Sequence, residues 1–308
     1  MFLSIIKLAR VDHWIKNVVV LMPVVFSKQI FGEDALVNVC YALTAAVAFC
    51  FASSFAYAIN DIKDAGADRK HPRKKNRPVA SGSISKKTAF VIAVCFFILA
   101  FGTSIAISQI LTFIVALYIA MQITYSTFLK KKPLIDVICI AMGFVLRAVA
   151  GAVAIEVKLS PWLFICMFTI CLFMGFCKRY NEMVTLGDAE TAKDHRPTLI
   201  LYTPDLLTHL ITLSAAIAVV VFLFYGLTPS TVERIGTNYL IYTLPLVVYA
   251  IFRFAMLSMR GVYADPTDLI IHDRPFQFTI GLWTLMTGGI ILYGEQLKDW
   301  LNTLYTLY

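Results

Sequence analysis

Long apolar stretches separated by short polar segments dominate this chain. Stretches of nearly membrane-spanning length fall at residues 15–31, 35–60, 87–108, 110–129, 134–156, 160–179, 205–227, 237–258 and 277–296. Because roughly 20 apolar residues in a helix cross the hydrocarbon core of a bilayer, this pattern predicts about nine transmembrane helices. The first stretch is short, and little more than Ser108 and Gln109 separates the third from the fourth.

Composition agrees with this pattern. The 308 residues are 59% hydrophobic and 15% charged, and the mean hydropathy is +0.76. An ordinary soluble domain does not have such values, so we expect an all-α, polytopic membrane helical bundle. The length suffices for one bundle with its loops, and we expect a single domain over residues 1–308. Residues 1–9 lack a signal-length apolar core, so the N-terminus is expected to stay in the mature protein.

The basic residues are unevenly distributed between the predicted loops. With a cytoplasmic N-terminus, the only Lys or Arg residues outside are Lys28, Lys158, Arg234 and Lys298. This bias follows the positive-inside rule and predicts a multi-pass cell membrane protein whose N-terminus and active site are cytoplasmic. The long loops at 62–86, 180–204 and 259–276 fall on the same side. The net charge of +8 then reflects orientation and anionic ligands or lipids, not nucleic acid.

Charge appears abruptly at the end of the second stretch, in residues 60–68. If the helix continues, Asn60, Asp64 and Asp68 lie about one turn apart, and Asp61 lies beside them. Oxygen ligands at this density suit Mg²⁺, which uses few protein carboxylates and leaves positions open for phosphate oxygens. We therefore predict Mg²⁺ bound by Asn60, Asp61, Asp64 and Asp68, with the three aspartates as catalytic residues. The alternative is a solvated helix end that merely carries acids.

The acidic residues and the basic segment that follows them together form motifs that are typical of a known protein family. Asn-Asp-x-x-Asp-x-x-x-Asp at 60–68, Arg69, and Asn-Arg-Pro-x-x-Ser-Gly at 76–82 resemble the first signature of the UbiA superfamily of intramembrane prenyltransferases. Residues 12–17 and 125–130 are also similar to that family. The resemblance implies a bundle around a central cavity that holds Mg²⁺ and a diphosphate-bearing substrate. Substrate-binding residues in this half are expected to be Lys16, Asn17, Arg73, Arg77, Tyr125 and Lys130.

Arginine is the residue type best suited to the phosphate role in this segment. Its guanidinium group binds phosphate oxygens in a bidentate manner, so Arg73 and Arg77 are the expected ligands. The lysines at 70, 74, 75, 86 and 87 are interpreted as positive-inside anchors.

The second large loop departs from the common pattern of the superfamily. Where prenyl-diphosphate users carry a second Asp-x-x-x-Asp, this chain has only Glu190-x-x-x-Asp194. It resembles instead the decaprenyl-phosphate phosphoribosyltransferase branch, as does the Leu-Arg-Ala-Val-Ala-Gly segment at 146–151. That branch implies phosphoribosyl diphosphate as donor and a polyprenyl phosphate as acceptor. The substrate-binding residues expected from it are Arg147, Lys178, Arg179, Tyr180, Glu182 and Arg196.

Arg147 lies inside the fifth apolar stretch. An arginine at the bilayer centre costs about 2.5–3.5 kcal/mol and usually faces the bundle interior, so Arg147 requires a partner. That partner is either a structural acid or carbonyl group, or a substrate phosphate. Lys178 and Arg179 have a competing interpretation, in which they are basic residues that merely end a membrane span at the cytoplasmic surface.

These observations predict Mg²⁺-dependent transfer of a 5-phosphoribosyl group from phosphoribosyl diphosphate to a polyprenyl phosphate. One alternative keeps the metal site but transfers a prenyl group from a prenyl diphosphate to an aromatic acceptor. Another is a membrane transporter, since multispan bundles with internal charge often move ions. The acids lie at a helix end and not at the midplane, which argues against transport.

Overall fold

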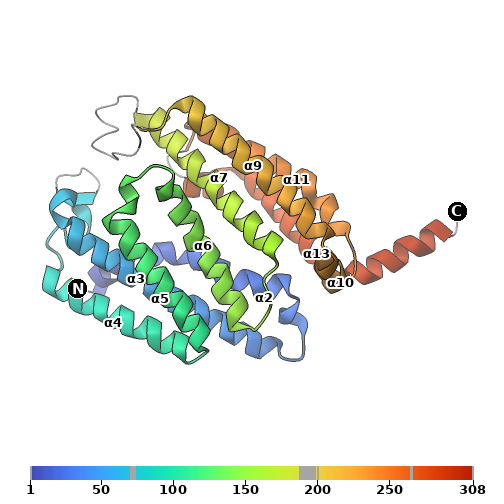
Figure 1. Ribbon diagram of the computed structural model, residues 1–308, viewed down its shortest axis with the longest axis horizontal. Coiled ribbons are helices and arrows are strands. Elements are labelled where there is room, and N and C mark those ends of the chain that lie inside the picture. The colour runs from blue at the N-terminus through green and yellow to red at the C-terminus, as the bar shows by residue number, and fades with distance from the viewer. Residues whose placement is uncertain (1, 70–73, 187–198, 200, 264–265, 307–308) are drawn as a thin grey trace. The chain divides into compact units, whose positions relative to one another are not determined.

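The computed structural model describes residues 2–69, 74–186, 199, 201–263 and 266–306. No strand occurs among these residues, and eight of their helices are long and apolar enough to cross a membrane. The predicted class, an all-α polytopic membrane bundle, is confirmed (Figure 1). The eight candidate spans correspond to the second through ninth predicted stretches.

The residues cluster into two compact units, of which the first comprises Met1–Lys130 and Gly143–Leu159. Its central helix is α3, which packs against α1, η1, α4 and α5. Buried alanines line the packed faces of α3 and α4, and such small residues let helices in a membrane approach closely. The helices of this unit, in chain order, are α1 (Phe2–Ala9), η1 (Val11–Leu21), α2 (Met22–Phe26), η2 (Gln29–Phe31), α3 (Ala35–Asp68), η3 (Lys74–Asn76), α4 (Lys86–Ile105), α5 (Gln109–Thr127) and most of η4 (Leu129–Lys131).

The second unit comprises Lys131–Met142 and Ser160–Tyr308. Its core lies where α7, α9, α11 and α13 meet, and it includes Phe173, Leu207, Phe254 and Phe276. The helices of this unit are α7 (Pro161–Leu186), α9 (Pro204–Leu227), α10 (Pro229–Ile235), η6 (Tyr239–Thr243), α11 (Leu244–Met259), α12 (Pro266–His272) and α13 (Arg274–Thr306).

Helix α6 (Ile135–Ala154) contributes to both units, because its first residues belong to the second unit and the rest to the first. The expectation that residues 1–308 form one domain stays a prediction.

The first predicted span, residues 15–31, differs from expectation. A 3₁₀ helix covers Val11–Leu21, and the short α2, with Pro23 in its first turn, follows at Met22–Phe26. A 3₁₀ helix rises about 2.0 Å per residue against 1.5 Å for an α-helix, so this 16-residue run reaches roughly 30 Å. That length equals the thickness of the hydrocarbon core of a bilayer, but Asp12, His13 and Lys16 lie in the first half of the run. The predicted count of about nine is close, although within the described part of the chain only eight segments are regular long helices.

Three helices extend well beyond the ends that hydropathy predicted. Helix α3 continues to Asp68, α7 to Leu186 and α13 to Thr306, so the predicted loops at 62–86 and 180–204 begin inside helices. Hydropathy ends a span where charge begins, whereas the backbone hydrogen bonds of a helix continue through charged residues.

Large apolar side chains cover the outer faces of the spans. On α4, for example, Phe90, Val91 and Ile98 are more than half exposed, and Leu213 is similarly exposed on α9. A surface of this kind is stable only in contact with lipid or another apolar surface.

Candidate functional site

A stripe of polar side chains follows the C-terminal part of α3. Tyr57, Asp61, Asp64 and Asp68 are spaced four, three and four residues apart, which places them along one face of the helix. Asn60 lies on α3 beside this stripe and is half-buried. The sequence predicted that these side chains lie close together if the helix continues through residue 68. The helix does continue to Asp68, and Asp61 and Asp68 are buried.

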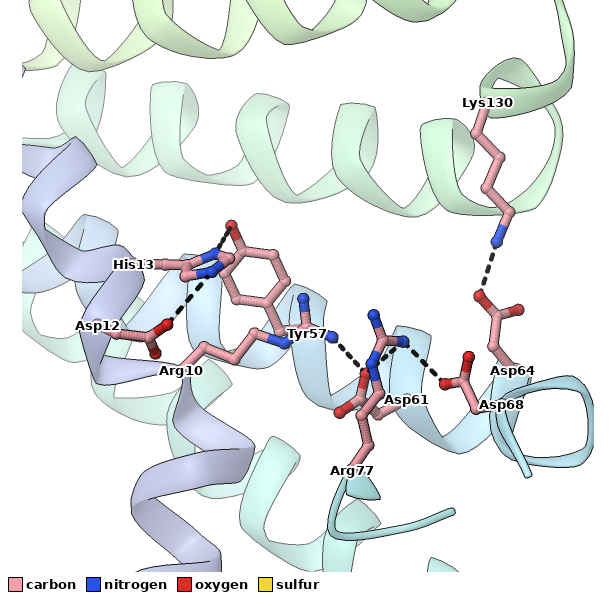
Figure 2. Close-up of polar contacts among 9 residues, drawn as sticks. All are labelled: Arg10, Asp12, His13, Tyr57, Asp61, Asp64, Asp68, Arg77 and Lys130. Carbon is pink, nitrogen blue, oxygen red and sulfur yellow. Dashed lines mark hydrogen bonds and ion pairs between the residues drawn. The ribbon is translucent and has the colours of Figure 1, made fainter. Parts of the chain in front are cut away.

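Each aspartate of the stripe pairs with a basic side chain from another part of the first unit (Figure 2). Arg10 donates to Asp61 Oδ1 over 2.6 Å, and Lys130 Nζ donates to Asp64 Oδ2 over 2.8 Å. Arg77 donates to Asp68 Oδ2 over 2.8 Å and lies 3.3 Å from Asp61 Oδ1. The structure thus brings together the three predicted aspartates with two of the predicted substrate-binding residues, Arg77 and Lys130.

The Asp61 carboxylate fits a divalent cation. Asp61 is 1% exposed, and its Oδ2 atom is buried with no hydrogen-bond partner. A buried carboxylate oxygen normally has a partner, and an ion supplies one. Among the described residues, no three His, Cys, Asp or Glu side chains form a ready cage. Mg²⁺ does not need one, because it commonly uses one or two carboxylates together with substrate phosphates. That all four predicted ligands bind one ion stays a prediction.

Arg147 is buried in the first unit and binds protein atoms. It donates to Asn17 Oδ1 over 2.7 Å, to the Gly143 carbonyl over 2.9 Å and to the Tyr118 hydroxyl over 2.8 Å. The guanidinium group also lies 4.8 Å from the centre of the Tyr118 ring. The sequence left open whether Arg147 pairs with a structural group of the protein or with a substrate phosphate. The contacts seen here are with structural groups of the protein. Contact of Arg147 or Asn17 with a substrate phosphate stays a prediction.

Replacing Asn17 by Leu is expected to lower the thermal midpoint of unfolding. The substitution removes the acceptor of Arg147 Nε, and losing a buried hydrogen bond to a charged group costs about 1.5–3 kcal/mol. Adding Arg147→Met to that variant is expected to restore part of the stability, because two apolar side chains leave no buried charge. Thermal unfolding in detergent measures both variants. A double variant no more stable than Asn17→Leu contradicts the interpretation.

A second buried polar cluster lies in the second unit, around Arg179. This side chain is 1% exposed, lies 3.2 Å from Asp136 Oδ2 through Nε, and pairs with Glu182. Tyr202 donates to Asp136 Oδ1 over 3.2 Å and accepts a 2.6 Å hydrogen bond from the backbone N–H of Leu134. Burial raises the pKa of Tyr202 to about 12, so its hydroxyl stays protonated at neutral pH. Arg179 thus has two carboxylate partners within the protein.

The other predicted substrate-binding residues are divided between the two units and the part of the chain that the structure does not describe. Lys16 and Tyr125 in the first unit, and Lys178 and Tyr180 in the second, are half-buried. Arg73 and Arg196 lie outside the described residues.

Lys74 belongs to the basic segment next to Arg77. Burial, followed by the charge of Arg77, lowers the pKa of Lys74 below its ordinary value. Lys74 is therefore less fully solvated than the anchor role predicted for it implies.

Sequence reasoning missed several members of these clusters. Arg10 lies in the N-terminal segment ahead of the first apolar stretch and carries no sequence signal that links it to Asp61. Asp136 stands in the first turn of a predicted span, where an unpaired acid is costly. Tyr57 and Tyr118 stand inside apolar runs, where a hydroxyl requires a partner.

Comparisons with known proteins agree with this architecture. The model of the UbiA prenyltransferase family matches residues 20–269. A decaprenyl-phosphate phosphoribosyltransferase of Corynebacterium glutamicum is 33% identical over 285 residues, which cover 91% of this chain and 84% of that protein. The protein of the same name in Mycolicibacterium smegmatis is 31% identical over 298 residues, covering 94% of this chain and 93% of its own.

Solved structures show the same fold at lower identity. A UbiA homolog from Archaeoglobus fulgidus bound to GPP and Mg²⁺ superimposes with a TM-score of 0.70 at 19% identity, covering 94% of this chain and 99% of that one. A digeranylgeranylglyceryl phosphate synthase gives a TM-score of 0.67 at 18% identity, with 96% and 99% coverage. The family model spans most of the chain, the relatives align over nearly all of it, and the helical fold agrees. This chain therefore belongs to the UbiA prenyltransferase family of membrane enzymes.

Proposed function

We propose that this enzyme transfers a 5-phosphoribosyl group from phosphoribosyl diphosphate to a polyprenyl phosphate and releases diphosphate, in a Mg²⁺-dependent reaction. The observation that carries the proposal is the set of three aspartates on α3, each of which pairs with an Arg or Lys side chain. One of these aspartates, Asp61, also has a buried carboxylate oxygen without a hydrogen-bond partner. The names of the relatives, aligned over more than nine tenths of this chain, supply the substrate classes.

The proposed chemistry exchanges one bond at the anomeric carbon of the ribose. The bond from this carbon to the diphosphate oxygen breaks, the carbon becomes oxocarbenium-like, and an oxygen of the lipid phosphate forms the new bond. A phosphate monoester has a second pKa of about 6, so the acceptor is mostly dianionic near neutral pH and needs no general base. The protein must therefore position two polyanions and reduce their mutual repulsion.

The residues of the first unit suit this task. Asp61, with Asn60, Asp64 and Asp68, would hold Mg²⁺, which supplies charge neutralisation to the departing diphosphate. Arg77 and Lys130 already lie beside the carboxylates and supply N–H donors for phosphate oxygens. In the second unit, Lys178 is more exposed than Arg179 and is the better phosphate ligand, whereas Arg179 is engaged by Asp136 and Glu182.

Location in the cell membrane with a cytoplasmic N-terminus and site is part of the proposal. It is supported by the uneven distribution of Lys and Arg and by the eight candidate spans. Membership of an enzyme family favours catalysis over the transporter alternative.

The test is incubation of the purified protein with Mg²⁺, isotope-labelled phosphoribosyl diphosphate and a polyprenyl phosphate, with mass spectrometry of the lipid fraction. We expect a labelled phosphoribosyl lipid, loss of product when a chelator removes the metal, and recovery when Mg²⁺ is restored. A parallel reaction supplies a prenyl diphosphate and an aromatic acceptor. Product in that reaction alone refutes the proposed donor.

A further inference from the structure

Arg10 connects α1 to η1 in a backbone conformation that L-residues rarely adopt, with φ 50° and ψ 54°. The chain on both sides of it is tied to α3. Ser54 Oγ donates to the carbonyl of the preceding residue, Ala9, over 2.8 Å and accepts from Trp14 Nε1 over 3.1 Å. The turn is therefore held in place, and it directs the Arg10 side chain toward the stripe on α3. A strained residue that its surroundings hold in place is often part of a functional site.

The Arg10 guanidinium group has two contacts on α3, one turn apart (Figure 2). It donates to Asp61 Oδ1 over 2.6 Å and lies 4.6 Å from the centre of the Tyr57 ring. The Tyr57 hydroxyl lies 3.3 Å from His13 Nδ1, which helps to orient the ring. The Arg10 side chain is 17% exposed against 1% for Asp61, so it is the partner that a ligand reaches more easily. The contact with Tyr57 does not depend on the carboxylate.

Arg10 is the principal counter-ion of Asp61. Arg77 is also near, but its shorter contact is with Asp68, at 2.8 Å against 3.3 Å to Asp61. A divalent cation bound to Asp61 Oδ2 would share this carboxylate with Arg10, which donates to Oδ1. The two positive charges repel each other, so Arg10 is the group that chiefly opposes binding of the ion.

We propose that Arg10 is a positioning residue that exchanges partners in the reaction. Before the substrate binds, it neutralises the buried Asp61 carboxylate and lowers the affinity of the site for a free divalent ion. When an ion arrives with a diphosphate, the guanidinium group leaves Asp61, keeps its contact with Tyr57 and donates to a diphosphate oxygen. The site then favours the metal together with the diphosphate over either alone. This inference rests on the proposed diphosphate-bearing donor.

The exchange predicts effects of opposite sign on two ligands. Arg10→Gln is expected to bind Mn²⁺, used as a probe for a hard divalent cation, roughly three- to tenfold more tightly without substrate, because a competing positive charge is gone. The same variant is expected to bind inorganic pyrophosphate about tenfold more weakly in saturating Mg²⁺, because a charge-assisted donor is lost. Isothermal titration calorimetry in detergent measures both affinities.

The matched control is Lys7→Gln, which removes the same charge three residues earlier from an exposed position on α1 and should leave both affinities unchanged. A merely structural ion pair predicts another result for Arg10→Gln, namely a lower thermal midpoint with Mn²⁺ affinity unchanged or weakened. That result, or unchanged pyrophosphate affinity, overturns the inference.

If Arg10→Gln does not fold, Arg10→Lys carries the test. Lysine keeps the charge but lacks the planar group that stacks on Tyr57 and binds two oxygens, so both affinities should shift in the same directions by a smaller factor. A folded Lys variant with wild-type affinities for both ligands overturns the inference.

Pyrophosphate is the common leaving group of phosphoribosyl and prenyl diphosphates, so these measurements do not depend on which donor is correct. Failure of the proposed donor appears only in the lipid product, and failure of the Arg10 exchange appears only in the two affinities.

Discussion

Asp64→Asn is expected to lower turnover by roughly a thousandfold or more while the purified protein stays folded. The substitution keeps the shape of the side chain but removes the charge that attracts a divalent ion, and loss of electrostatic stabilisation of a leaving group has effects of this size. Asp64 suits the test because it is 27% exposed and pairs with Lys130 at a similarly exposed position. Initial rates of labelled lipid formation, together with the thermal midpoint, measure the effect.

Asp61→Asn should abolish turnover as well, but with lower stability. Asp61 is buried between Arg10 and Arg77, so the variant leaves two cations without their shared carboxylate. The matched control is Asp205→Asn in the first turn of α9, where the acid is exposed, and this variant should keep wild-type turnover.

For Asp64→Asn, a normal rate of phosphoribosyl transfer would show that Asp64 is not part of the metal site.

Gly151→Ala is expected to prevent correct folding or to destabilise the protein by about 3 kcal/mol or more. A Cβ atom at this position of α6 would lie 1.9 Å from the carbonyl oxygen of Val20 and 2.8 Å from its carbonyl carbon. Both atoms belong to the backbone of η1 and cannot rotate away, so the helix must move. The yield of folded protein and the thermal midpoint in detergent measure the effect.

Gly102→Ala on α4 is the control for this substitution, because a Cβ atom there has nothing within 4 Å. This variant should be neutral or more stable by up to about 1 kcal/mol, since alanine favours a helix over glycine. A wild-type midpoint for Gly151→Ala would contradict the close packing of α6 on η1.

Gly151 and Arg147 together give a physical reason for the segment at 146–151 that resembles the phosphoribosyltransferase branch. Arg147 donates to Asn17 of η1, and one turn later Gly151 lets α6 contact the η1 backbone at Val20. Both residues tie α6 to η1, the 3₁₀ helix that follows Arg10. The segment thus supports the N-terminal turn structurally, in addition to any contact with substrate.

Several features were predictable from sequence because they are local. The length of an apolar stretch decides whether a helix spans a bilayer, and eight of the nine predicted stretches are such helices. The spacing of Asp61, Asp64 and Asp68 on one helix decides that they share a face. The motif at 60–82 identified the family that the comparisons confirm.

The partners of those residues were decided only by tertiary structure. Arg10 and Asp61 are 51 positions apart, Lys130 and Asp64 are 66 apart, and Arg147 and Asn17 are 130 apart. The left-handed turn at Arg10 and the 3₁₀ form of residues 11–21 likewise depend on packing against α3 and α6. Helix formation and membrane insertion depend on neighbouring residues, whereas the pairing of a buried charge depends on which distant segments fold against it.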